Sequence, residues 1–127
     1  MLTILHDSKP IYLQIKNMIE DQIVNEQLQE HDQIPSTTQM VHFYKINHIT
    51  AAKGINLLVD KGIIYKRRGV GMFVADGARS KLIQDRKNAF ADSYVLPMIQ
   101  EAKKLGLTDN DVSNLINFLR ERDEDES

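Results

Sequence analysis

The chain has 127 residues, enough for one domain of about 70 to 80 residues and an appendage, but not for a second large core. The absence of cysteine excludes disulfides and thiolate metal sites, and without a signal peptide or a long apolar run we expect a soluble cytoplasmic protein. The net charge of −2, from 16 basic and 18 acidic residues, counts modestly against nucleic-acid binding.

The first predicted helix follows Ser8 and Pro10, a pair that suits a helix start. Its apolar residues recur at helical spacing and should form one buried face. They are Tyr12, Ile15, Ile19 and Ile23. A tyrosine in such a stripe is more often a core residue than a ligand, so we assign Tyr12 and Gln14 to structure rather than to contact with a partner.

Two further helices are predicted close together. The first begins at Ser36, whose hydroxyl can cap the helix with Gln39 completing a capping box, and it runs to about Tyr44. Lys45 and Ile46 then form a turn, and Asn47 suits the N-cap of the next helix. Two helices at this spacing predict a helix-turn-helix.

The second of these helices has two different faces. An apolar stripe at three- and four-residue steps should face the core, and it comprises Ala51, Ile55 and Leu58. The opposite face carries His48, Ile49, Ala52 and Lys53. Such groups can hydrogen-bond to base edges or touch a thymine methyl in the major groove. Gly54 lies within the helix, and we expect it to let another helix approach closely.

A basic hairpin is predicted after Gly62, which should end the helix in a left-handed conformation. Residues 63–65 have β-type composition. Gly69 and Gly71 flank the tip, beside Arg67 and Arg68, so that the backbone can approach a phosphate. An ordinary solvated hairpin with a basic edge is the alternative. Together with the two helices, the hairpin predicts a winged helix-turn-helix.

The charge distribution supports this placement. Residues 42–72 hold six cations against Asp60 alone, 6 − 1 = +5, whereas residues 1–41 hold two cations against six acids, 2 − 6 = −4. Because phosphate contacts supply most nonspecific affinity, a small positive patch on an acidic body predicts weak nonspecific binding and dependence on dimerisation.

Residues 79–105 are expected to be helical, with a kink or two shorter helices meeting near Leu96 because of Pro97. Their apolar face would hold Ile83, Phe90, Tyr94, Met98, Ile99, Ala102 and Leu105.

Gly106 should end this helical segment, and Thr108 should cap a last helix with Asp111 at its third position. That helix has a stripe of Val112, Leu115, Ile116 and Leu119. The run from Glu121 to Glu126 is expected to be a frayed, solvated tail.

These one-sided helices cannot close a core alone, so they must pack on the first domain or on a second copy of the chain. We favour a homodimer, which would place two recognition helices on half-sites about 34 Å apart in an inverted repeat. The expected dimerisation residues are Phe90, Tyr94, Met98, Ile99, Leu105, Leu115 and Leu119. We therefore expect a DNA-binding domain over residues 1–76 and a helical dimerisation extension over 77–127. The fold class is mainly α with a small β-hairpin.

Residues 9–76 resemble the DNA-binding domain of the GntR family of bacterial transcription regulators. The matching segments are Pro10-Ile11-Tyr12-Leu13-Gln14-Ile15, Ile34-Pro35-Ser36, Asn47, Thr50, Gly62-Ile63-Ile64-Tyr65 and Arg67-Arg68-Gly69-x-Gly71-x-Phe73-Val74. Motif and resemblance together place the following residues at DNA: Ser36, Thr38, Lys45, Asn47, His48, Ile49, Thr50, Lys53, Arg67, Arg68, Gly69 and Gly71. This sequence departs from the family pattern at Thr38, Lys45 and His48, so its operator cannot be carried over from relatives.

The short helical extension is similar to that of the YtrA subfamily. This resemblance implies a homodimeric repressor of a nearby operon, in many cases one that encodes an ABC transporter. It leaves any small-molecule effector unidentified.

Two other classes of function remain to be weighed. The four histidines show no metal-binding spacing and no partnered carboxylate nearby, and no serine lies in a nucleophile elbow, so we expect no enzyme, no catalytic residue, no metal and no cofactor. A winged-helix protein-interaction module without sequence-specific DNA binding is the more serious alternative. The basic hairpin with Lys53 and Thr50 favours DNA.

Overall fold

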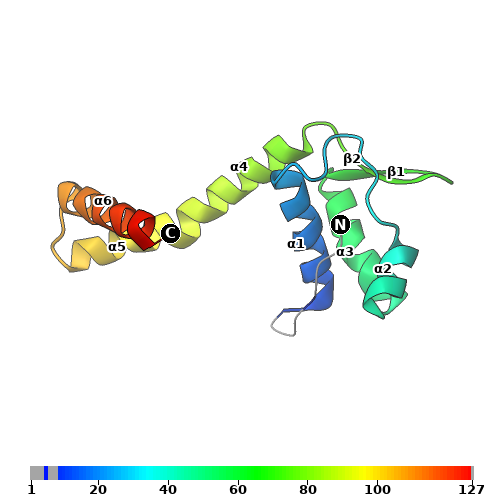
Figure 1. Cartoon of the computed structure of the whole chain (residues 1–127), viewed down its shortest axis with the longest axis horizontal. Helices are drawn as coiled ribbons and strands as arrows, with labels where there is room; N and C mark the ends of the chain where they lie inside the picture. The colour runs from blue at the N-terminus through cyan, green and yellow to red at the C-terminus, as the bar shows by residue number, and fades with distance from the viewer. Residues whose placement is uncertain (1–4, 6–8, 127) are drawn as a thin grey trace. The chain divides into compact units, whose positions relative to one another are not determined.

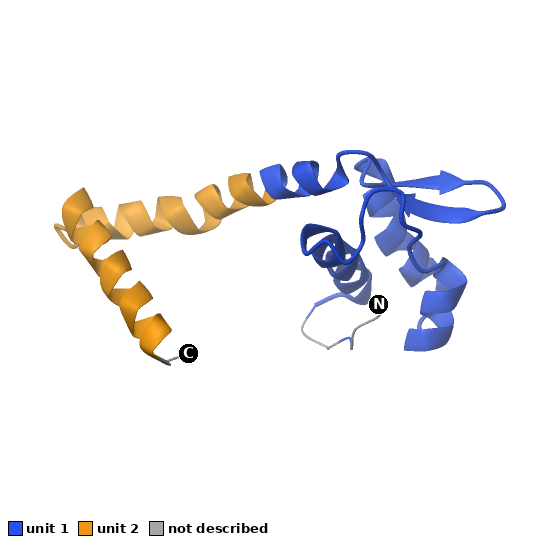
Figure 2. Cartoon of the chain, turned by 45° about the horizontal axis from the view of Figure 1, so that its top comes forward, with its two compact units in different colours: residues 1–85 blue, residues 86–127 orange. Residues whose placement is uncertain are grey.

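The computed structural model describes residue 5 and residues 9–126, which form two compact units. The first ends at Asp85 and the second begins at Arg86 (Figure 2). Ser8, expected at the first helix start, lies outside the described residues. Among those described, no helix combines the length and the apolar character that a membrane span needs.

The core of the first unit lies between α1 (Ile11–Val24) and α3 (His48–Asp60), which pack against each other (Figure 1). Most of the two predicted stripes is confirmed, because Ile15, Ile19 and Ile23 of α1 are buried with Ala51, Ile55 and Leu58 of α3. Tyr12, the remaining member of the α1 stripe, is half-buried. Gly54 makes the close approach possible, as expected. A Cβ there would lie 2.6 Å from the carbonyl oxygen of Tyr12.

The helix-turn-helix follows the predicted pattern. Helix α2 (Thr37–Tyr44) begins with the expected capping box, in which Gln39 N–H donates to Ser36 Oγ at 3.0 Å and Ser36 N–H donates to Gln39 Oε1 at 2.8 Å. Lys45 then adopts a left-handed conformation with φ 58°, which turns the chain toward Asn47, the N-cap of α3. Because lysine has a Cβ, the left-handed conformation is less favourable for it than it would be for glycine.

The wing is an antiparallel hairpin of β1 (Ile64–Arg67) and β2 (Gly71–Val74). Residues 31–34 run along the other side of β2, a feature that we did not predict. The N–H groups of His31 and Ile34 donate to the carbonyls of Val74 and Met72 at 2.8 and 2.9 Å. This segment anchors the base of the wing to the loop between α1 and α2.

The first turns of α4 (Ala78–Phe90) belong to the first unit. Ala78 and Leu82 are buried in its core, whereas Ile83, expected on the apolar face, is half-buried. Arg79 Nε donates to the Val24 carbonyl at 2.9 Å. The compact unit therefore extends beyond the boundary expected after residue 76.

The second unit contains the end of α4, the π-helical turn η1 (Ala91–Val95), α5 (Leu96–Lys104) and α6 (Asp109–Glu126). The predicted break near Leu96 takes the form of this π turn, in which Leu96 N–H donates to the Ala91 carbonyl. Pro97 follows it near the start of α5, where its missing N–H is tolerated.

Helix α6 starts with the predicted capping pair. Thr108 N–H donates to Asp111 Oδ2 at 2.9 Å, and Asp111 N–H donates to Thr108 Oγ1 at 3.1 Å. The tail is exposed over residues 121–125, as expected, but it is not frayed in the structure, because the helix continues to Glu126. Glutamate is a good helix former, and the run contains no glycine or proline to end the helix.

Candidate nucleic-acid interface

The start of α3 presents an exposed, mixed polar and apolar surface. Asn47 Oδ1 accepts a 2.7 Å hydrogen bond from Ile49 N–H, so the helix start is fixed. His48 is exposed beside Ile49, whose side chain is 76% exposed. An isoleucine so exposed contributes nothing to this core and is suited to contact a thymine methyl.

The same face of α3 forms a shallow groove lined by His48, Ile49, Ala52, Lys53, Asn56, Leu57 and Asp60. Lys53 Nζ lies 4.0 Å from the centroid of the Tyr12 ring. This cation–π contact holds the ammonium group over α1. Tyr12 is half-buried and contacts Lys53, and its assignment to structure stays a prediction.

Gln14 is structural, as expected. Its side chain is buried and donates a 2.7 Å hydrogen bond from Nε2 to the Lys9 carbonyl.

The wing tip is built around a tight turn. Val70 N–H donates to the Arg67 carbonyl at 2.9 Å, and Gly69 lies within this turn at φ 76° with open space where a Cβ would be. Arg68 is exposed, and the Arg67 guanidinium lies 5.8 Å from the Phe73 ring. Two charged groups therefore flank a backbone turn accessible to phosphate.

Gly71 has a structural role in addition to the one expected. At φ 146° it leaves room for Gln33, whose amide nitrogen would lie 2.4 Å from a Cβ at this position. Gln33 Nε2 donates to the Val70 carbonyl at 3.2 Å, so it supports the tip of the wing.

Asn56 and Lys66 connect the recognition helix to the wing. Sequence reasoning counted Lys66 only within the positive charge of residues 42–72 and missed Asn56. Lys66 Nζ donates to Asn56 Oδ1 at 3.3 Å, and both residues are exposed. Asn56 follows Ile49, Ala52 and Lys53 at helical spacing, which could have identified it. An asparagine can pair with adenine through both polar atoms of its amide.

The remaining predicted residues differ in their positions. Thr38 and Lys45 are exposed on α2 and at the turn, and Thr50 is half-buried in the first turn of α3. The hydroxyl of Ser36 and the amide of Asn47 are occupied by capping, so these two residues shape the helix starts. The six cations of residues 42–72 are all exposed.

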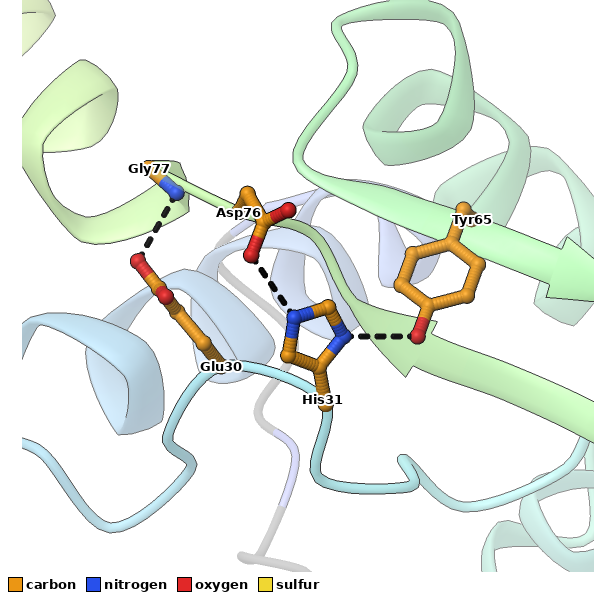
Figure 3. Close-up of polar contacts among 5 residues, drawn as sticks. All are labelled: Glu30, His31, Tyr65, Asp76 and Gly77. Atoms are coloured by element: carbon orange, nitrogen blue, oxygen red, sulfur yellow. Dashed lines mark hydrogen bonds and ion pairs between the residues drawn. The ribbon is translucent and has the colours of Figure 1, made fainter.

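One prediction about the histidines was wrong. His31 is partnered by a carboxylate, because its Nε2 lies 2.7 Å from Asp76 Oδ1 (Figure 3). The two residues are 45 positions apart, so no local spacing reveals the pair.

The seven residues expected at a dimer interface are exposed in the single chain. They are Phe90, Tyr94, Met98, Ile99, Leu105, Leu115 and Leu119. Among the described residues, ten of the fourteen exposed large apolar side chains lie between Phe90 and Leu119.

The arrangement of α2, α3 and the wing corresponds to a known family model. Residues 11–74 match the model of the bacterial regulatory proteins of the gntR family. The chain belongs to the GntR family. It is 32% identical over 101 residues to the uncharacterized HTH-type transcriptional regulator YhcF of Bacillus subtilis, covering 80% of this chain and 82% of YhcF. These relatives are transcription regulators and not enzymes.

Solved structures of GntR regulators support the assignment. A family member from Bacteroides thetaiotaomicron aligns with a TM-score of 0.71 at 32% identity, over 89% of this chain and 98% of that one. The DNA-binding domain of AraR in complex with operator ORE1 aligns with a TM-score of 0.51 at 27% identity, over 59% of this chain and 94% of that domain. YtrA from Sulfolobus acidocaldarius, at 22% identity and a TM-score of 0.52 over 96% of this chain and 97% of that one, shares the fold. The chain is thus a DNA-binding regulator with a winged helix.

Proposed function

We propose that the protein is a homodimeric, sequence-specific repressor that binds an inverted-repeat operator. The observation that carries this proposal is the exposed face of α3 lying beside a basic wing, with Lys66 hydrogen-bonded to Asn56 between them. The AraR domain bound to an operator supports a DNA-binding role for this fold.

Recognition would combine base reading by α3 with phosphate contact by the wing. His48 offers one donor or acceptor at each ring nitrogen, Ile49 offers an apolar contact, and Lys53 offers a cation. Arg68 and the backbone at Gly69 supply charge and close approach at the wing tip. Because a histidine contacts guanine less firmly than an arginine, we expect operator recognition to depend on several modest contacts.

Dimerisation would bury the apolar side chains of the second unit. Phe90, Tyr94 and Leu105 are each more than half exposed in the single chain, at 59%, 69% and 63%. Many exposed large apolar side chains in one unit indicate an interaction site. A second copy of the chain would also double the phosphate contacts, which the weak positive patch requires.

The regulated genes are inferred from resemblance alone. The short helical extension is similar to that of YtrA-like regulators, and from this we propose repression of a nearby operon, with an ABC transporter operon as the first candidate.

The proposal is tested by selecting bound sequences from a random duplex library at about 0.15 M salt, where weak phosphate-only binding is screened. We expect an enriched inverted repeat. Lys53→Ala and His48→Ala should change the preferred bases, whereas Arg68→Ala should weaken binding to all sequences and flatten the salt dependence. Recovery of no motif would instead favour the protein-interaction module.

The homodimer is tested by sedimentation of full-length variants. Leu115→Lys and Ile99→Lys place charges on side chains exposed in the single chain, so they should convert a dimer to monomers while leaving the monomer folded. Phe43→Lys, exposed on α2 in the first unit, is the matched control and should remain dimeric. Monomeric wild-type protein would refute the dimer.

A truncation adds a second test. Deletion of residues 86–127 is preferable to removal of everything after the wing, since Ala78 and Leu82 belong to the first core. We expect the truncated protein to be monomeric and to lose most of its operator affinity. A truncated protein that remained dimeric would contradict the placement of the interface.

A further inference from the structure

A cluster of polar side chains lies at the base of the wing (Figure 3). Glu30 and His31 are adjacent in the loop after α1, Asp76 follows β2, and Tyr65 lies on β1. One ligand atom from each of Glu30, His31 and Asp76 falls within 4.8 Å of the other two. None of the four residues is among those expected at DNA, so the cluster requires a separate explanation.

The imidazole of His31 is held at both ring nitrogens. Its Nε2 lies 2.7 Å from Asp76 Oδ1, and its Nδ1 lies 2.8 Å from the Tyr65 hydroxyl oxygen. The backbone is fixed as well, because His31 N–H donates to the Val74 carbonyl at 2.8 Å. His31 has φ 68°, an unusual conformation for a residue other than glycine, so the fold imposes this position on the side chain.

This arrangement has the features of a metal-binding histidine. A histidine that binds a metal through one ring nitrogen generally donates its other N–H to an oxygen, which fixes the tautomer and the direction of the ring. The Tyr65 hydroxyl can accept that hydrogen bond from Nδ1–H. Nε2 then points its lone pair toward the two carboxylates, where a cation would relieve the repulsion.

We propose that Glu30, His31 and Asp76 bind one divalent transition-metal cation. The three groups supply one imidazole nitrogen and carboxylate oxygens, a set that suits Zn²⁺, Co²⁺ or Ni²⁺. Mg²⁺ and Ca²⁺ prefer sites made of oxygen ligands alone and should bind less well. The side chains of His31 and Asp76 are 55% and 81% exposed, so water would complete the coordination.

The hydrogen bonds of the cluster can adjust to the cation. In the neutral ring without metal, Nε2–H donates to Asp76 and the Tyr65 hydroxyl donates to Nδ1. On binding, the ring proton moves to Nδ1 and donates to the Tyr65 oxygen, while Nε2 binds the metal. Glu30 keeps its 2.8 Å hydrogen bond from Gly77 N–H through one carboxylate oxygen, leaving the other for the cation.

The cation would join segments that are distant in the sequence. Glu30 and His31 precede α2, whereas Asp76 and Gly77 connect β2 to α4. Because only the folded chain brings these ligands together, binding should raise the thermal midpoint of unfolding. None of the three ligands is among the residues expected to contact the operator or a second copy of the chain.

The test is titration of the tag-free full-length protein with Zn²⁺ by calorimetry and with Co²⁺ by absorption. We expect one cation per chain and no comparable binding of Mg²⁺. Asp76→Asn and His31→Asn should each weaken Zn²⁺ binding at least about tenfold, and Tyr65→Phe about tenfold through loss of the orienting hydroxyl. Asparagine is chosen at His31 because it tolerates the left-handed conformation.

The matched control is His42→Asn, an exposed histidine on α2 outside the cluster, which should bind Zn²⁺ as the wild type does. Circular dichroism shows whether each variant is folded. Absence of Zn²⁺ binding to the wild type at millimolar metal would overturn the proposal. Equal affinity in wild type and Asp76→Asn, or loss of binding in His42→Asn, would also overturn it.

Discussion

The contact between α1 and α3 makes Gly54 the position where the smallest substitution should have the largest effect. In Gly54→Ala, the new Cβ would lie 2.6 Å from the Tyr12 carbonyl oxygen and 3.3 Å from both Cβ and Cγ2 of Ile15. The Tyr12 oxygen belongs to the backbone of α1, so it cannot rotate away as a side chain could. Helix α1 would have to move.

The expected loss of stability is the difference between two effects. Alanine favours the helix over glycine by about 1 kcal/mol. Overpacking of a close-packed core costs about 1 to 3 kcal/mol, and contact with backbone places this case near the upper end. We therefore expect Gly54→Ala to lower the free energy of unfolding by about 2 kcal/mol, or the thermal midpoint by roughly 8 to 16 °C in a domain of this size.

Urea unfolding of the full-length protein, followed by circular dichroism at the helix band, measures this change. Ala52→Gly in the same helix is the control for propensity, and it should cost about 1 kcal/mol without any clash. An increase in stability for Gly54→Ala, as in an uncrowded helix, would refute the close approach of α1 and α3.

Three other predictions concern the turn, the recognition face and α6. Lys45→Gly should raise the free energy of unfolding by about 0.5 kcal/mol, because relief of left-handed strain exceeds the added entropy of the unfolded chain; a lower urea midpoint would contradict this. Asn56→Ala should reduce base discrimination at one operator position by about 1 to 3 kcal/mol in sequence selection, and an unchanged motif would exclude Asn56 from base reading. The pKa of Asp111 is lowered by hydrogen bonds from the Thr108 backbone and then its hydroxyl. A carboxyl group with a lowered pKa in the folded state stabilises that state above the unfolded pKa, and this stabilisation is lost as the pH falls through the folded pKa. Below about pH 4 the first turn of α6 should therefore lose hydrogen-exchange protection in the wild type. In Asp111→Asn the protection of this turn should not decrease further as the pH falls.

The local features of the fold could be predicted because their causes lie within a few residues. The Ser36–Gln39 and Thr108–Asp111 capping pairs each join positions three apart, and the structure forms both. The left-handed residue Gly62 ends α3 where it was expected. Helical periodicity likewise predicted most of the buried faces of α1 and α3, because residues three or four positions apart lie on the same side of a helix.

Predictions about the second half of the chain were less complete. Pro97 predicted a kink or two shorter helices near Leu96, and α5 does begin at Leu96, but the backbone stays helical at Phe90 and Leu96 through a π turn that the sequence did not predict. The apolar pattern also suggested Ile83 for a buried face, whereas Leu82 is buried because the start of α4 packs on the first core. Which of these two side chains is buried depends on the direction in which α4 leaves the wing.

The sequence by itself determined the order of the elements, the capped starts of α2, α3 and α6, and the residue types presented by the recognition helix, since caps, glycine turns and periodicity act over one or two helical turns. Tertiary structure decided which distant groups meet. It placed Lys66 beside Asn56, residues 31–34 along β2, and His31 against both Tyr65 and Asp76. The contacts of residues 31–34 and of His31 form only when the wing closes on the loop after α1, and their long sequence separation leaves no periodic signal to identify them in advance.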